Sequence, residues 1–163
     1  MKFLFVLLII PVFSIGQTVH IKDDKIVYEG RENIPGLSAE EISRKVQKAL
    51  PGLVRNYIND TRSVNSVRAR GELKLKTPYT IIRTVSYFIT VHAKENGYDY
   101  KIDSVFFKEK VRGGKEVTKS STEVLEGISE TGRVVGETEK VLNETDMKFQ
   151  RLLALLRLEI NKS

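Results

Sequence analysis

The chain of 163 residues contains no cysteine and no tryptophan, and its only histidines are His20 and His92. Without cysteine, the chain cannot form disulfides, zinc knuckles, thiol nucleophiles or a lipid-modified N-terminal cysteine. Two histidines far apart in the sequence do not supply the ligands of a closed metal site either. We therefore expect no metal and no cofactor.

Long hydrophobic runs are also missing, since a membrane-spanning helix needs about twenty apolar residues. The candidate run, Phe3–Ile10, follows Lys2 and is interrupted by Pro11. A basic start, a short apolar run and a small-residue exit at Ser14–Gly16 are the parts of a secretory signal peptide. A membrane anchor is the alternative, but the residues that follow are polar. We predict that residues 1–16 are cleaved after Gly16, which leaves a secreted or periplasmic chain without a transmembrane segment.

The rest of the chain has the length of one domain with a hydrophobic core of its own. Its formal net charge before cleavage is +6, with 29% charged residues. That balance favours contact with anionic surfaces, although an ordinary soluble surface has a similar composition. We predict that residues 17–24 form a flexible tail and residues 25–163 a single domain.

Local signals place the first elements. A strand is expected at 25–30, and Ser38 and Glu41 have the spacing of a helix capping box. Proline is unfavourable inside a helix, so Pro51 predicts a kink or a restart near Leu50. The expected apolar face of this helix has helical spacing and comprises Ile42, Val46, Ala49, Leu50, Leu53 and Tyr57.

Alternating side chains predict a half-buried strand over residues 68–76, after a shorter strand within 56–62. The clearest local signal is a hairpin from about residue 80 to residue 110, with Asn96-Gly97 in a two-residue type I′ turn. This turn pairs residues whose numbers sum to 193. The pairs that follow are Lys94 with Asp99, Ala93 with Tyr100, Val91 with Ile102, and Tyr87 with Phe106.

The connection 111–136 is rich in glycine, serine, threonine and charge. Either Ser120–Glu123 caps a short helix through Ile128, or the segment is a mobile flap. A long helix is expected from Thr138. Its predicted buried face consists of Leu142, Phe149, Leu152, Leu153, Leu156 and Ile160, and this leucine-rich face must dock on the sheet or on a partner.

Three segments carry a likeness to known sequences: Ile34–Ile42, Gly71–Leu75 and Ser86–Asp103. Through them the chain resembles a family of secreted Bacteroidetes proteins, a domain of unknown function with a TBP-like fold. The likeness covers about residues 25–110 and, more loosely, the last helix. It implies one α+β domain in the order β-α-β-β-β-β-α, with an antiparallel sheet packed on one face by two helices. It implies no activity.

One surface is a candidate for binding, because basic and apolar side chains alternate on the outward side of the predicted strands. Such surfaces bind polyanions, with cations meeting charges and rings stacking. The alternative is an ordinary wet sheet face, covered by residues 111–136 or by a partner. The candidate residues are Arg68, Arg70, Lys74, Lys76, Phe88, His92, Lys101, Val105 and Phe107.

No catalytic constellation stands out. Gly127–Thr131 nearly matches a nucleophile elbow but lacks its closing glycine. Asp99 and Asp103, four positions apart on one strand, leave a small carboxylate-dependent hydrolase as an alternative. We expect a non-enzymatic exported binding module whose partner is an envelope protein, a glycan or an anionic surface such as a lipid. Export argues against nucleic acid, and a homodimer stays open.

Overall fold

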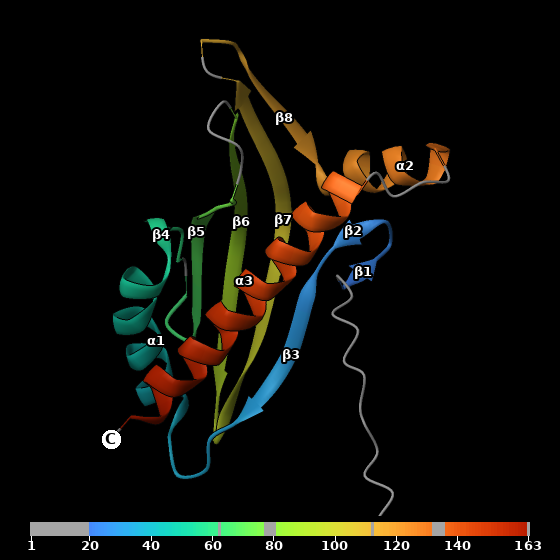
Figure 1. Ribbon diagram of the computed structural model, residues 1–163. Helices are drawn as coiled ribbons and strands as arrows, with labels where there is room; N and C mark the ends of the chain where they lie inside the picture. The colour runs from blue at the N-terminus through green and yellow to red at the C-terminus, as the bar shows by residue number, and fades with distance from the viewer. Residues whose placement is uncertain (1–19, 62, 77–80, 112, 132–135, 163) are drawn as a thin grey trace, which may run out of the picture.

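The computed structural model describes residues 20–61, 63–76, 81–111, 113–131 and 136–162. The predicted signal peptide, residues 1–16, lies outside the described residues. The secondary-structure elements follow in chain order (Figure 1): β1 Ile21–Lys22, β2 Lys25–Ile26, β3 Tyr28–Asn33, α1 Ala39–Leu53, β4 Arg55–Asn59, β5 Ser66–Lys74, β6 Ile81–Lys94, β7 Gly97–Val111, β8 Glu116–Ser120, α2 Ser121–Thr131 and α3 Gly136–Asn161.

A six-stranded antiparallel sheet lies at the centre, in the order β3-β7-β6-β5-β4, with β8 also paired to β7. One edge of β7 is shared, because β3 pairs with residues 97–102 and β8 with residues 106–110. Helices α1 and α3 lie against the same face of this sheet (Figure 1). The predicted α+β class, with one sheet face packed by two helices, is confirmed.

The core lies between the sheet and the two helices. Phe149 of α3 is fully buried there, and its ring centroid is 5.1 Å from that of Tyr28 and 5.0 Å from that of Tyr87. Burying a large apolar side chain is worth about 1.5–3 kcal/mol. The predicted buried face of α3 is therefore directed inward, with Leu152, Leu156 and Ile160 buried and Leu153 partly buried.

A buried polar contact joins the first strand of the large sheet to the last helix. The Tyr28 hydroxyl of β3 donates to Asp146 Oδ1 of α3 at 2.8 Å. Burial, with the bond to Asp146, raises the pKa of Tyr28 far above its usual value. The hydroxyl therefore remains a proton donor, and the carboxylate is satisfied inside the core.

The capping box of α1 is present. Ser38 N–H donates to Glu41 Oε2 at 2.9 Å, and Glu41 N–H donates to Ser38 Oγ at 3.3 Å. The predicted restart near Leu50 is wrong, since α1 continues through Pro51 to Leu53. Pro51 lies in the last turn and cannot donate to the carbonyl of Gln47, but α1 still continues past it, and Val54 N–H donates to Leu50 O at 2.8 Å.

The β6–β7 hairpin is present, but its predicted register is wrong. Lys94 pairs with Gly97, so Glu95 and Asn96 form the turn, and the paired numbers sum to 191 from there to Phe88 and Asp103. Tyr100, rather than Ile102, therefore lies opposite Val91. The observed sum differs from the predicted one by two, an even number. Each side chain near the turn therefore stays on the sheet face predicted for it.

Contacts with the loop before α1 explain the turn. Asn96 has φ 59°, its N–H donates to Leu37 O at 3.0 Å, and its O accepts from Ile34 N–H at 2.8 Å. Gly97 lies so close to β3 that an added Cβ would be 2.3 Å from Glu32 O. The glycine is therefore needed for close approach, and Asn96 supplies the positive φ.

Two segments outside the helix-covered sheet are more regular than expected. Ser120 and Glu123 cap α2 by reciprocal hydrogen bonds of 2.6 Å and 3.2 Å, so the helix alternative for this region is the one observed.

Strand β8 was not anticipated from the sequence. Residues 20–24, expected as tail, contain β1 and a tight turn in which Asp23 and Asp24 have φ 50° and 55°.

Candidate functional site

The sheet face turned away from α1 and α3 is called the open face below. Ala69, Ile89 and Ile102 are fully buried on the helix side, so their strand neighbours point the other way. The predicted surface residues that this places on the open face are Arg68, Arg70 and Lys74 of β5, Phe88 and His92 of β6, and Lys101 of β7.

The prediction that Val105 and Phe107 share this face is wrong. A β-bulge lies opposite Tyr87, and Ser104 in β7 adopts φ 53°. The extra residue reverses the alternation, so Val105 is 2% exposed and Phe107 packs against the core. Phe106, 41% exposed, takes their place on the open face.

The predicted partner of Phe88 changes with the bulge, because Phe88 lies opposite Asp103 rather than Val105. Lys76 differs in another way. It follows the end of β5, and its backbone N–H donates to both carboxylate oxygens of Glu144 in α3, at 3.0 and 2.9 Å. Lys76 thus belongs to a loop tied to the helix layer.

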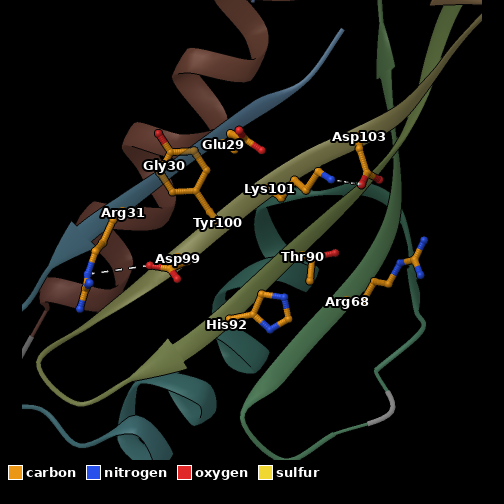
Figure 2. A pocket seen from close by; sticks show the side chains of 10 residues that line it. All are labelled: Glu29, Gly30, Arg31, Arg68, Thr90, His92, Asp99, Tyr100, Lys101 and Asp103. Atoms are coloured by element: carbon orange, nitrogen blue, oxygen red, sulfur yellow. Dashed lines mark ion pairs between the residues drawn. The ribbon is translucent and has the colours of Figure 1, made fainter. Parts of the chain in front are cut away.

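A shallow hollow of about 640 Å³ lies on the open face near the Asn96 turn. Figure 2 shows charged side chains standing on β3 and β7 on one side and Arg68 on β5 on the other, with Thr90 and His92 of β6 between them. The lining residues are Glu29, Gly30, Arg31, Arg68, Thr90, His92, Asp99, Tyr100, Lys101 and Asp103.

Acidic and basic groups alternate around this hollow. Arg31 Nε lies 3.8 Å from Asp99 Oδ1, and Lys101 Nζ lies 3.4 Å from Asp103 Oδ2. Lys94 also binds Asp99. Each carboxylate therefore has a basic neighbour, and the hollow presents pairs of opposite charge rather than a basic patch.

Arg68 closes the β5 side of the hollow. Its guanidinium carbon lies 4.3 Å from the centroid of the Phe88 ring, and its Nε lies 3.6 Å from Asp60 Oδ2. Cation–π contact of this kind needs a ring face within about 6 Å. One face of Phe88 is thus already occupied by a side chain of the protein, which argues against base stacking there.

The two carboxylates considered for catalysis both line the hollow. The hydrogen bond from Lys94, with further attraction from Arg31, holds the pKa of Asp99 below its usual range. A general acid at neutral pH needs the opposite shift. Asp103 is paired with Lys101, so each of the two carboxylates faces a basic group rather than an apolar pocket.

Basic groups dominate the open face further along β5. Glu72 accepts from Asn56 at 2.5 Å and lies 3.3 Å from Lys108. Arg70 and Lys74 form no ion pair with any described residue. These two side chains are the part of the predicted surface that keeps an unpaired positive charge.

Sequence reasoning missed the contribution of β3. Glu29 and Arg31 both line the hollow, and β3 carries Arg31 because it extends to Asn33, beyond the strand expected at 25–30. The signal was the alternation of Tyr28, Gly30 and Glu32 with these two residues. Gly30 obscures this pattern because glycine is uncommon inside a strand. Glycine is required at this position, since an added Cβ would lie 2.5 Å from the Tyr100 hydroxyl oxygen.

Within the described residues, no three His, Asp or Glu side chains are grouped so that they could hold a metal ion. None of the described helices is both long and apolar enough to cross a membrane. Neither observation identifies a ligand.

The chain has a TBP-like α+β fold. It is similar to a TBP-like protein from Parabacteroides distasonis with a TM-score of 0.73 and 13% identity, over 89% of this chain and 98% of that one. It is also similar to a DUF4468 family protein from Bacteroides ovatus with a TM-score of 0.66 and 15% identity, over 91% and 93% of the two chains.

The expected resemblance to TBP-like Bacteroidetes domains of unknown function is confirmed by these two structures. Neither of them is described as an enzyme. No protein-family model matches the chain, and no curated protein matches it. The fold alone does not define a function.

Proposed function

We propose that this protein is an exported, non-catalytic binding domain of the cell envelope that binds a partner polypeptide at the hollow on its open face. The observation that carries the proposal is the set of alternating charges on a sheet face that neither α1 nor α3 covers. Export rests on the signal-peptide pattern of residues 1–16.

The charge pattern favours a partner segment that carries both signs. Arg31 and Lys101 attract carboxylates, whereas Asp99 and Asp103 repel them and attract basic groups. A uniform polyanion would meet repulsion at both aspartates. A polypeptide with alternating charges can replace the ion pairs within the hollow by ion pairs with its own side chains. The order of its charges then fixes how the polypeptide aligns with the hollow.

A polyanion is the second candidate, and one observation favours it. Arg70 and Lys74, beyond the hollow, form no ion pair with any described residue, and the acidic neighbour of Arg70, Glu72, is already bound by Asn56 and Lys108. A glycan or lipid headgroup of negative charge could bind them without contact with the two aspartates. The two candidates therefore predict different effects of removing the acidic side chains.

Paired charge variants separate these candidates. The protein is produced with its own leader, recovered from the periplasm of a bacterial host, and applied to immobilised bacterial envelope proteins. The basic variant is Arg31→Ala with Lys101→Ala, and the acidic variant is Asp99→Ala with Asp103→Ala. Both should weaken binding by about tenfold, since a charge pair in an interface is worth about 1.5 kcal/mol or more.

The matched control is Arg44→Ala with Lys48→Ala, two exposed residues of α1 on the other side of the sheet. This variant should bind as the unchanged protein does. If the acidic variant binds as tightly as before or more tightly, the mixed-charge partner is rejected in favour of a polyanion. If all variants bind alike, the open face is not the binding surface.

A further inference from the structure

The far ends of β6, β7 and β8 extend past α1 and α3 (Figure 1). The tip, defined here as residues 81–83, 109–110 and 115–119, exposes two large aliphatic side chains. Ile82 is 51% exposed and Val117 is 54% exposed. Both belong to strands, where an exposed apolar side chain has no role in the core.

These two side chains lie at the same level of the sheet but on opposite faces. Ile82 pairs with Lys110, and Val117 pairs with Glu109. Because successive residues of a strand point to opposite faces, the partners of Glu109 and Lys110 do so as well. The tip thus exposes one large aliphatic side chain on each face.

Lysines surround the two apolar side chains. Lys110, Lys115 and Lys119 are exposed and form no ion pair with any described residue. The acidic group on β7, Glu109, is already bound to Arg83 at 2.7 Å. Glu116, which pairs with Lys110 across the strands, is the second acidic residue of the tip, so four basic residues stand against two acidic ones and the tip keeps an excess of positive charge.

We propose that the tip inserts shallowly into the surface of an anionic lipid bilayer. A protein partner with one docking surface would cover Ile82 or Val117, whereas the interfacial layer of a bilayer surrounds a thin three-stranded tip on both faces. Interfacial burial extends about 5–10 Å, and long basic side chains reach the headgroups from there. This inference does not rest on the proposed role of the hollow, which lies near the opposite end of the β6–β7 hairpin.

The test uses the full protein and two kinds of vesicle, phosphatidylcholine alone and phosphatidylcholine mixed with phosphatidylglycerol. Flotation should recover the protein with the anionic vesicles only. Lys110→Glu, Lys115→Glu and Lys119→Glu together should weaken this binding by about a hundredfold or more, because each lysine near an anionic surface contributes about a fivefold factor. The reversal control is Arg44→Glu, Lys48→Glu and Lys140→Glu, which alters exposed helix residues and should leave binding nearly unchanged.

A second variant, Ile82→Ser with Val117→Ser, separates lipid insertion from plain charge attraction. It should lower vesicle binding by about tenfold while leaving binding to soluble heparin unchanged. Ile58→Ser is its control, since Ile58 is 57% exposed on β4, outside the tip. Equal vesicle binding by the Ile82/Val117 variant and the unchanged protein would overturn the proposal and leave a polyanion surface. Equal recovery with both kinds of vesicle would overturn its electrostatic part.

Discussion

The two faces of β6 have different compositions although they share one backbone. Val85, Ile89 and Val91 are fully buried under the helices, while His92 on the opposite face is exposed. The buried face consists of apolar contacts, whose energy depends on packing volume. The open face consists of charge pairs in water, whose energy is small and depends on salt. Stability and recognition can therefore be altered separately by choosing the face.

The largest expected difference between the faces concerns two phenylalanines. Phe149→Ala, on the covered side, should lower the free energy of unfolding by about 3–5 kcal/mol, because it leaves a cavity between two tyrosine rings. Phe106→Ala, on the open face, should lower it by less than about 1 kcal/mol. Urea denaturation followed by circular dichroism measures both values. Similar losses for the two variants would show that the open face is covered by structure of its own.

A glycine pair tests how tightly the covered face is packed. An added Cβ at Gly71 would lie 2.3 Å from Val54 Cγ1 and 2.9 Å from the Tyr87 ring. Gly71→Ala should therefore destabilise the protein by about 1–3 kcal/mol. Gly52→Ala in the last turn of α1 meets nothing within 4 Å and should be neutral or slightly stabilising. Melting temperatures give the comparison, and a tolerant Gly71 would mean that the contact with Val54 relaxes without cost.

The smallest effect on stability is expected for the ion pair on the open face. Lys94→Met should raise the pKa of Asp99 toward its usual value, because the hydrogen bond that lowers it is lost. A lowered pKa in the folded state stabilises the fold above the unfolded pKa, about 3.9 for aspartate, and this contribution disappears as the pH falls through the folded pKa. The variant should therefore lose stability mainly above pH 4. NMR titration of the Asp99 carboxyl checks the shift, and an unchanged pKa would assign the cause to Arg31 instead.

Much of the fold could be predicted because local and global signals agree. The capping box at Ser38, the helical spacing on α3 and the alternation on β5 each depend on nearby residues, and each is present in the structure. Short connections between successive elements then allow few arrangements in which both helices cover the same face of the sheet. Pro51 was misjudged because its position relative to the helix end decides its cost, and that end depends on Val54.

The candidate site was only partly predictable, and the errors have physical causes. The bulge at Ser104 is a single extra residue with no sequence signature, and it moves Val105 and Phe107 to the covered face. Pairing by β3 joins residues about seventy positions apart in the chain, so no local pattern places Arg31 beside Asp99. The six residues that were placed correctly lie on regular strands, where the period of two is enough.

The bond between Tyr28 and Asp146 has a consequence for the order in which the protein is completed. Synthesis begins at the N-terminus, yet β3 finds its strand partner only in β7 and its buried hydroxyl partner only in α3. Until the last helix exists, β3 can pair with β7, but its buried hydroxyl at Tyr28 has no carboxylate to bind. A chain cut short before Asp146 thus lacks more than its final helix, because an early strand loses its anchor as well, and the growing protein stays open to chaperones until its end has been made.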